Sequence, residues 1–358
     1  MRAFVIEAID QYTIRDDVHT AELGPRDVRV QMKAAGVCRT DHSAINGKWP
    51  TKLPCVNGHE GAGIITEVGA GVRDREVGQH VVIGAPYCGV CYYCTHGSPW
   101  FCIHKDQGGE NAKFLLRDGT PVYSMVGKGT WSEEMVVSAW GVTPIPDAVP
   151  FEVAALIGCA VMTGTGQVIN VARPEAGSSA IIFAGGGIGS CTLMGARLTG
   201  CGPIVAVDPA RPKHEALRHF GATHVIVPEQ VPDAIAELTS GRGFDYSFEN
   251  VGRPETLRAA WDATRKGGTV VVTGLGGTEG RVEFDLNELA VLGKHLIGNM
   301  SGGLLAPRDY PRYAQLYLLG RLDLDSLISR RGSIDDLPRF LSALDEDPTI
   351  QRQVIAFE

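Results

Sequence analysis

Several features are missing from this 358-residue sequence, and each absence excludes a class of protein. No apolar run approaches the roughly 20 residues that a membrane-spanning helix needs. The N-terminal stretch MRAFVIEAIDQYTIRDD has acidic residues where a signal peptide would have its apolar core. The net charge is −8 and no block of lysines and arginines is present, so nucleic acids and anionic membranes are not expected as partners. We therefore predict a cytoplasmic protein.

The composition also lacks the bias of a disordered or disulfide-rich chain. Hydrophobic residues make up 44% and charged residues 21%, which is typical of a folded globular protein. The nine cysteines are odd in number and no export signal accompanies them, which favours metal binding over a disulfide framework. At 358 residues the chain exceeds the length at which one core keeps growing, so two domains are expected.

The pattern of apolar residues changes along the chain. Residues 1–32 and 60–90 contain short alternating runs broken by glycine and proline, which predicts a mostly antiparallel β domain. A helix is expected over FEVAALIGCAVMTGTGQVINVA. From about residue 177, apolar strands alternate with helices, which predicts a parallel sheet with helices on both faces. The final strand, QRQVIAF, resembles the first part of the chain, so we expect the chain to return there. The fold class is α/β.

Four cysteines lie within the segment CGVCYYCTHGSPWFC at residues 88–102. Thiolates at these intervals can surround one Zn²⁺ tetrahedrally, and four sulfur ligands leave no position for a substrate. A structural zinc held by Cys88, Cys91, Cys94 and Cys102 is therefore expected. The alternatives are a loop of free cysteines, a disulfide pair or an iron–sulfur cluster.

A second group of zinc-type ligands lies between Gly36 and Gly63. Cys38 and His59 are residues that zinc accepts, and Asp41 could orient a ligand histidine from behind. Two ligands do not complete a site, so a further ligand is expected elsewhere in the chain.

The segment AGGGIG, residues 184–189, has the form of a dinucleotide-binding turn. Gly186 would let the backbone approach a pyrophosphate, and Gly189 would let the following helix pack closely on the strand. Ala184 departs from the glycine at the first position. Asp208 ends the next strand, where an acid binds ribose hydroxyls and repels a 2′-phosphate, so NAD is favoured over NADP despite Arg211 nearby. The alternative is a glycine turn that binds nothing.

Together these motifs resemble the zinc-dependent alcohol dehydrogenases of the medium-chain dehydrogenase/reductase family over essentially the whole chain. The resemblance rests on C-x-T-D at 38–41, G-H-E-G-x-G at 58–63, the four cysteines, G-C-x-x-x-T-G at 158–164, the turn at 184–189 with Asp208, and DYSFENVG at 245–252. It implies a GroES-like, zinc-binding catalytic domain at 1–160 and 300–358, and a doubly wound Rossmann NAD-binding domain at 161–299.

The resemblance also supplies the missing ligand. Cys159 would join Cys38 and His59 on a catalytic zinc, with Glu60 as a transient ligand and Asp41 holding the ring of His59. Zinc of this kind lowers the pKa of an alcohol, which then gives hydride to the nicotinamide. A packed helix cysteine and a surface acid are the alternatives for Cys159 and Glu60.

The expected proton route is less regular. Thr40 matches the hydroxyl that accepts the alcohol proton, but the relay histidine of many members is replaced by Ser43, with His42 one residue earlier. Either a local backbone shift brings His42 to the ribose, or the proton leaves through ribose and water. We favour the second route.

The resemblance places further residues around the cofactor and the substrate. The implied NAD contacts are Arg39, Thr163, Gly186, Gly187, Ile188, Gly189, Asp208, Lys213, Val251, Gly274, Leu275 and Arg352. Arg39, Lys213 and Arg352 are solvated surface charges in the alternative interpretation. The implied substrate pocket is Thr40, Trp49, Gly84, Trp131, Leu275 and Met300, and Gly84, in place of a bulky residue, predicts space beside the zinc.

The expected activity is the reversible oxidation of a primary alcohol with an apolar, aromatic or terpenoid body. The alternative within the family is a thiol-adduct-dependent formaldehyde dehydrogenase, although Lys48 and Pro50 replace the acidic pair that binds glutathione. A non-catalytic zinc protein and a zinc-free quinone or enoyl reductase are competing hypotheses. The resemblance also implies a homodimer built through the nucleotide-binding domains, because dimeric members of the family keep a full-length loop between Cys102 and Trp131, as this chain does.

Overall fold

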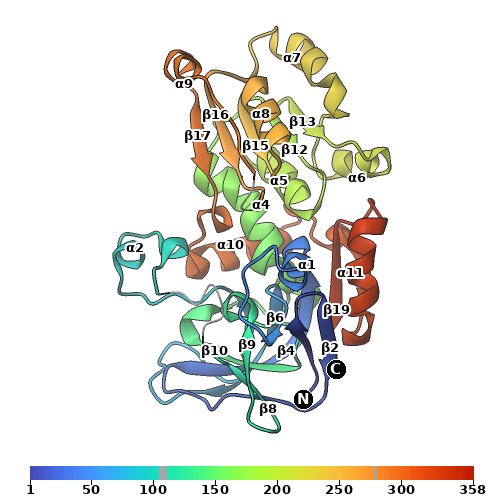
Figure 1. The fold of residues 1–358 in the computed structure, drawn as a ribbon. Coiled ribbons are helices and arrows are strands. Elements are labelled where there is room, and N and C mark those ends of the chain that lie inside the picture. The colour runs from blue at the N-terminus through green and yellow to red at the C-terminus, as the bar shows by residue number, and fades with distance from the viewer. Residues whose placement is uncertain (105–110, 278–279) are drawn as a thin grey trace. The chain divides into compact units, whose positions relative to one another are not determined.

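The computed structural model describes residues 1–104, 111–277 and 280–358 (Figure 1). The chain forms two compact units: Met1–Cys159 with Leu305–Glu358, and Ala160–Leu304. Part of the loop between Cys102 and Trp131, residues 105–110, lies outside the described residues.

The first unit is built on two sheets, in the orders β2-β1-β5-β9-β8-β3 and β11-β7-β6-β4-β19-β18, with β10 also paired to β4. Most pairs are antiparallel, as predicted, and β5–β9 and β18–β19 are parallel. Its strands are β1 (Ala3–Ala8), β2 (Gln11–Arg15), β3 (Val18–Thr20), β4 (Asp27–Val37), β5 (Cys55–Val56), β6 (Gly61–Val68), β7 (His80–Ile83), β8 (Phe114–Leu116), β9 (Pro121–Ser124), β10 (Glu134–Ser138), β11 (Val142–Pro144), β18 (Ile328–Gly332) and β19 (Arg352–Ala356). Its helices are α1 (Arg39–Ile45), α2 (Tyr92–Thr95), α3 (Phe151–Leu156), α10 (Ala306–Leu318) and α11 (Leu337–Glu346), with short turns η1 (Pro99–Phe101), η2 (Met125–Gly127), η3 (Ala139–Gly141), η9 (Asp325–Leu327) and η10 (Ile334–Asp336).

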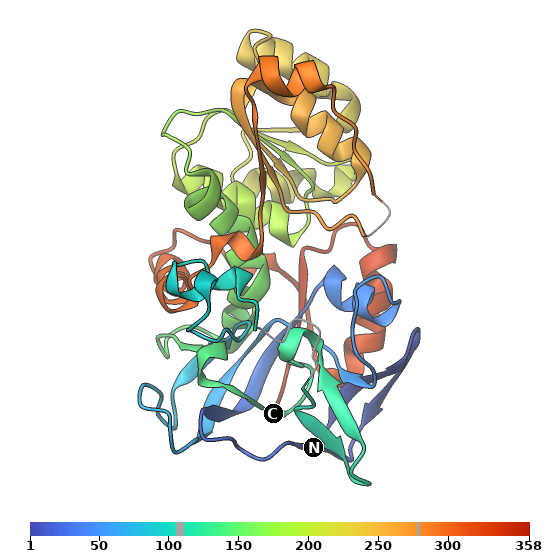
Figure 2. The same cartoon turned by 60° about the vertical axis from the view of Figure 1, so that its left-hand side comes forward.

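Strand β4 shows how sequence alternation becomes a core. Val28, Val30 and Met32 point to one face and are fully buried, while the residues between them are more exposed. Each such side chain contributes about 1.5–3 kcal/mol by leaving water. The C-terminal strand β19 pairs antiparallel with β4, so the predicted return of the chain is confirmed, and the two termini end near each other (Figure 2).

The predicted long helix is present as a continuous segment, Phe151–Ala172. It consists of α3, a π-helical turn η4 (Ile157–Val161), α4 (Met162–Gly166) and a second π turn η5 (Gln167–Ala172). The expectation that no apolar run reaches membrane-spanning length was wrong, because this helix is long and apolar enough. However, 89% of its most apolar window is buried within the fold, which is typical of a core helix.

The second unit is a parallel six-stranded sheet in the order β14-β13-β12-β15-β16-β17, flanked by helices (Figure 1). This is the strand order of a Rossmann fold, and the predicted parallel sheet is confirmed. Its strands are β12 (Ala180–Phe183), β13 (Ile204–Val207), β14 (His224–Ile226), β15 (Phe244–Glu249), β16 (Thr264–Val272) and β17 (His295–Gly298). Its further helices are α5 (Gly187–Leu198), α6 (His214–His219), α7 (Val231–Thr239), α8 (Pro254–Ala263) and α9 (Leu286–Leu292), with turns η6 (Arg211–Lys213), η7 (Pro228–Gln230) and η8 (Ser301–Gly303).

Candidate active site and metal groups

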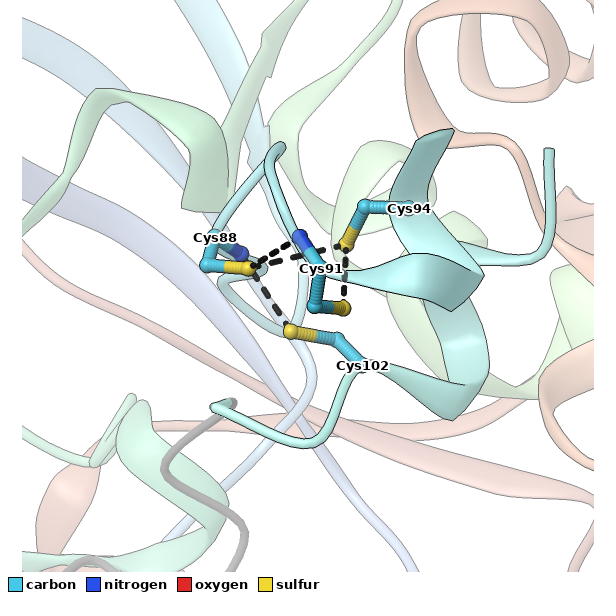
Figure 3. A group of neighbouring side chains, drawn as sticks. All are labelled: Cys88, Cys91, Cys94 and Cys102. Atoms are coloured by element: carbon cyan, nitrogen blue, oxygen red, sulfur yellow. Dashed lines mark hydrogen bonds between the residues drawn. The ribbon is translucent and has the colours of Figure 1, made fainter. Parts of the chain in front are cut away.

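The four cysteines of residues 88–102 converge, with their sulfur atoms within 4.8 Å of one another (Figure 3). Cys91 caps the short helix α2, Cys94 lies within that helix, and Cys102 follows η1. The sulfur atoms of Cys91 and Cys94 lie 3.5 Å apart, and those of Cys88 and Cys94 lie 3.9 Å apart. None of the nine cysteines forms a disulfide, so the disulfide alternative for this segment is excluded by the structure.

Main-chain N–H groups point at these sulfur atoms. The N–H of Cys91 donates to the sulfur of Cys88 at 3.3 Å, and the N–H of Cys88 donates to the sulfur of Cys102 at 3.3 Å. Hydrogen bonds from the backbone lower the pKa of Cys91 to about 6 and lower that of Cys88. Burial and the neighbouring thiols raise the pKa of Cys94 to about 12. The cluster could therefore hold a cation that binds four thiolates, as structural zinc does.

A second group joins segments that are far apart in the chain. The ligand atoms of Cys38, His59, Glu60 and Cys159 lie within 4.8 Å of one another, and all four residues are buried. Cys38 follows β4 and caps α1, His59 and Glu60 precede β6, and Cys159 lies in the π turn η4. The structure thus brings Cys159 to the two ligands that the sequence identified.

Asp41 fixes the orientation of His59. Its Oδ1 lies 2.6 Å from Nδ1 of His59, and its Oδ2 accepts the N–H of Cys38 at 2.8 Å. The other ring nitrogen, Nε2, faces the sulfur of Cys159 at 3.3 Å and is directed into the group. Burial lowers the pKa of His59, but Asp41 and Cys38 outweigh it and raise the pKa to about 10. Burial also raises the pKa of Asp41.

The side chain of Glu60 reaches the metal group by passing Gly36, where only a glycine leaves enough space. A Cβ atom at Gly36 would lie 2.2 Å from Oε2 of Glu60, so the carboxylate needs Gly36 opposite it. Its carboxylate makes no hydrogen bond within the described part of the chain, although Nε of Arg352 lies 3.4 Å from its Oε1. Burial raises the pKa of Glu60 to about 7, against the opposing charge of Arg352.

The charges around this group fit a divalent cation. The potential anions are Cys38, Asp41, Glu60 and Cys159, and the buried cations are Arg352, Lys128 and, when no metal is bound, the imidazolium of His59. Buried charge is costly unless it is paired, so the surplus of anions would be neutralised by a bound Zn²⁺. The donor set of two thiolates and one imidazole is also one that catalytic zinc uses, and the buried carboxylate of Glu60, which accepts no hydrogen bond from the described residues, lies beside it.

Residues 126–131 support the turn that carries His59 and Glu60. The ammonium group of Lys128 donates to the main-chain carbonyl oxygen of His59 at 2.9 Å. The hydroxyl of Thr130 donates to the main-chain carbonyl oxygen of Glu60, also at 2.9 Å. Gly58 has φ +90°, and a Cβ there would lie 2.4 Å from the indole of Trp131. Sequence reasoning missed Lys128, because a lone lysine in a glycine-rich loop gives no signal of burial.

Replacing Lys128 by methionine is expected to lower kcat/KM and zinc affinity by about 10- to 100-fold, the usual effect of losing a supporting partner behind a metal ligand. The side chain is 3% exposed, so the change removes a buried charge from beside the anions and leaves the His59 carbonyl without its ammonium donor. Zinc content by atomic emission and steady-state kinetics measure the effect. Lys33→Met is the matched control, because that exposed ammonium donates to a main-chain oxygen of Glu358. Equal losses in both variants would contradict the assignment.

Other predicted site residues of the first unit have definite places. The hydroxyl of Thr40 lies 3.8 Å from the sulfur of Cys38. Arg39 is exposed and pairs with Asp345 of α11 at 2.7 Å, and Nδ1 of His42 lies 3.6 Å from the same carboxylate. In contrast, Arg352 is buried and faces Glu60 and Cys38, so it is no solvated surface charge.

The predicted pocket residues of this unit are less open than expected. Trp131 is fully buried, donates its indole N–H to Gly36, and packs edge-on against Phe4. Trp49 is half-buried against the same core. Space beside the zinc at Gly84 stays a prediction, and the phenol of Tyr310 borders this position, since a Cβ there would lie 3.1 Å from its hydroxyl oxygen.

In the second unit, the turn at 184–189 has the geometry of a dinucleotide cradle. Gly186 caps α5, and a Cβ there would meet nothing within 4 Å, so the space above this backbone is open. A Cβ at Gly189 would lie 1.8 Å from the carbonyl oxygen of Ala184. Ala184 itself adopts φ +95°, a conformation that favours glycine. Gly187 and Ile188 begin α5, whose free N–H groups could bind a pyrophosphate.

Asp208 follows β13 and is 5% exposed. Its carboxylate accepts the N–H of Gly185 at 2.7 Å and the N–H of Ala210 at 2.8 Å, and Nζ of Lys213 lies 4.0 Å away. Lys213 is therefore placed beside the acid that would bind the ribose.

The segment DYSFENVG shapes the carboxyl end of β15. The carboxylate of Glu249 accepts the N–H groups of Val251 and Gly252, each at 2.8 Å. A Cβ at Gly274 would lie 1.9 Å from the nitrogen of Gly252, so the loops after β15 and β16 touch through two glycines. Val251 and Leu275 are exposed there. Thr163 is buried in α4, and Met300 precedes η8 and is half-buried.

The chain matches two family descriptions: "Alcohol dehydrogenase GroES-like domain" over residues 24–147 and "Zinc-binding dehydrogenase" over residues 187–318. It therefore belongs to the zinc-dependent alcohol dehydrogenases of the medium-chain dehydrogenase/reductase family, as the sequence predicted. It is 32% identical to S-(hydroxymethyl)glutathione dehydrogenase of Paracoccus denitrificans, covering 93% of this chain and 94% of that protein.

Two solved structures are similar over the full chain. An alcohol dehydrogenase zinc-binding domain protein from Burkholderia ambifaria superposes with a TM-score of 0.94 at 28% identity, covering 100% of this chain and 98% of that one. Benzyl alcohol dehydrogenase from Acinetobacter calcoaceticus superposes with a TM-score of 0.92 at 26% identity, covering 100% and 99%. The chain is thus an oxidoreductase with a GroES-like unit and a Rossmann unit.

Proposed function

We propose that this enzyme oxidises a primary alcohol reversibly with NAD, using one catalytic and one structural zinc. The observation that carries the proposal is the buried group of Cys38, His59 and Cys159, with Asp41 orienting the imidazole. When bound, zinc supplies Lewis acidity that favours the deprotonated alcohol, and the nicotinamide accepts the hydride. The lack of disulfides among the nine cysteines suits the reducing environment of a cytoplasm.

The chain's own residues would prepare the substrate. Thr40 would take the alcohol proton at Oγ1, since its hydroxyl lies beside Cys38. His42 is directed toward Asp345, so the onward acceptor of this proton would be a ribose hydroxyl that a bound cofactor supplies, together with water. Arg352 would keep the carboxylate of Glu60 charged and close to the metal ligands.

The turn at 184–189 and Asp208 support NAD as the cofactor. Replacing Asp208 by glycine is expected to lower the NAD/NADP ratio of kcat/KM by about 10- to 100-fold, the effect of losing a charge-assisted hydrogen bond to the ribose. Kinetics with both cofactors measure the ratio. Asp262→Gly, an exposed acid of α8, is the control, and an unmoved ratio in the Asp208 variant would show that another residue discriminates.

The substrate is proposed to have an apolar, aromatic or terpenoid body, and the similarity to benzyl alcohol dehydrogenase supports an aromatic alcohol. A second candidate is a thiol-adduct-dependent formaldehyde dehydrogenase, favoured by the similarity to S-(hydroxymethyl)glutathione dehydrogenase. Lys48 and Pro50 are exposed and not acidic, which argues against glutathione but leaves another thiol open.

The test is a panel of aliphatic, aromatic and terpenoid primary alcohols, with formaldehyde in the presence and absence of glutathione and other low-molecular-weight thiols. NADH formation with aromatic or terpenoid alcohols and no thiol requirement is expected. Turnover of formaldehyde only in the presence of a thiol would favour the second candidate. If protein that contains two zincs turned over no substrate of the panel, both candidate functions would be refuted.

A homodimer through the second unit is proposed from its edge strand. β17 ends the sheet, and among the described strands only β16 pairs with it. Leu296 of β17 is 44% exposed, and Leu286 and Val291 of α9 are 82% and 73% exposed, so an apolar edge is available to a second copy. Leu296→Lys is expected to convert the dimer to a monomer in light scattering, whereas Val77→Lys, at an exposed valine of the first unit, should leave it dimeric. A wild-type monomer would overturn the proposal.

A further inference from the structure

The end of strand β7 lies directly beside the metal group. A Cβ at Gly158 would lie 2.9 Å from the carbonyl oxygen of Ile83 and 3.7 Å from the nitrogen of Gly61. Gly158 precedes Cys159 in the chain, and Gly61 follows Glu60. Gly84, the next residue after β7, is buried and donates its N–H to Gly141 at 2.7 Å. Gly84 therefore has a fixed backbone position. It directly follows Ile83, whose carbonyl oxygen packs against Gly158, the residue before Cys159.

A side chain from another part of the sequence fills the space that Gly84 leaves. Tyr310 lies on helix α10 and is fully buried. A Cβ at Gly84 would lie 3.1 Å from its hydroxyl oxygen, 3.2 Å from Cε2 and 3.6 Å from Cζ. The outer edge of the phenol ring therefore lies in tight contact with the point where a side chain at position 84 would begin, and leaves no room for a large one.

The same phenol lies within electrostatic reach of the metal group. Burial raises the pKa of Tyr310, and the charge of Cys159 raises it further. Ile83, the residue before Gly84, packs against Gly158, the residue before Cys159, so the ring of Tyr310 lies beside a segment that adjoins the group. Since protein interiors are close-packed, a small residue at one position and a large one opposite form a single wall.

We propose that Tyr310 is a specificity-determining residue that sets the width available to the alcohol on the Gly84 side of the metal group. The wall is supplied by helix α10 (Ala306–Leu318) in place of a side chain at the end of strand β7. This inference rests on the proposed function, because it concerns the alcohol bound at that group. It predicts that the limit on substrate width follows the size of residue 310.

Tyr310→Ala is expected to raise the kcat/KM of wide primary alcohols, such as naphthylmethanol, relative to a slim alcohol such as hexanol by at least about tenfold, the scale on which a pocket discriminates one or two carbons. Tyr310→Phe keeps the ring and should leave this ratio within about threefold. Tyr313→Ala is the matched control, because Tyr313 is also fully buried on α10. Tyr310→Leu provides a milder enlargement if the alanine variant folds poorly.

A thermal-unfolding cycle tests the shared space without activity. Gly84→Phe alone should lower Tm, because two rings cannot occupy one place. Combined with Tyr310→Ala, it should recover much of that loss, whereas additive losses would overturn the shared wall. An unchanged width ratio in Tyr310→Ala, or an equal change in Tyr313→Ala, would overturn the specificity role. If the wild type oxidises no alcohol, the proposed function and the specificity role fail together, and a non-additive cycle would then show that the shared wall itself stands.

Discussion

Replacing Cys159 by serine is expected to abolish alcohol oxidation and to remove about one zinc per chain. A thiolate is a strong ligand of zinc, whereas a neutral serine hydroxyl at the same position is a poor one. The Lewis acidity of the metal is worth several kcal/mol, so its loss corresponds to at least about a thousandfold fall in turnover. Binding of NAD should persist, because the dinucleotide cradle lies in the turn at 184–189.

Atomic emission, NADH formation and a fluorescence titration with NADH measure these three outcomes. Cys201→Ser is the matched control, because that cysteine belongs to neither metal group and its sulfur contacts Thr199. It should retain both zincs and its activity. Full zinc content with substantial turnover in the Cys159 variant would remove Cys159 from the ligand set, and loss of NADH binding would indicate a folding defect instead.

The sequence was sufficient for the parts of the fold that depend on local pattern. The alternation in β4 specified a two-faced strand, and the apolar strands before Gly186 and Asp208 specified a parallel sheet. The spacing of the four cysteines also predicted their convergence, since the segment is short. Cys159 was different: it lies about a hundred residues after His59, so only the family resemblance connected them.

The sequence pattern could not predict contacts between segments that are far apart in the chain. Lys128 looks like a surface lysine in the sequence, yet it donates to the carbonyl of His59. Gly84 suggested room, and the packing of α10 brings the phenol of Tyr310 to the border of that place. Both contacts were missed for one reason: a single residue type indicates what a position lacks, whereas close packing decides which distant side chain lies against it.

The second large effect concerns the four-cysteine group. Cys94→Ser is expected to remove the other zinc and to lower Tm by on the order of 10 °C, since loss of a structural metal is among the few changes that cost about 4 kcal/mol or more. The sulfur of Cys94 lies near those of both Cys88 and Cys91, so three thiolates would lose a shared counter-ion. The remaining catalytic group shares no residue with this cluster, so turnover at low temperature should fall far less than stability.

Differential scanning calorimetry, zinc content and kinetics at a temperature well below Tm separate these effects. Ser98→Ala is the matched control, because this half-buried residue directly precedes η1, between Cys94 and Cys102, and its side chain makes no capping hydrogen bond. It should keep both zincs and nearly the wild-type Tm. If Cys94→Ser kept its Tm after losing a zinc, the metal would not be structural. If turnover fell as steeply as in Cys159→Ser, the two metal groups would be coupled, because a loop that only stabilises the fold affects the rate solely through the folded fraction.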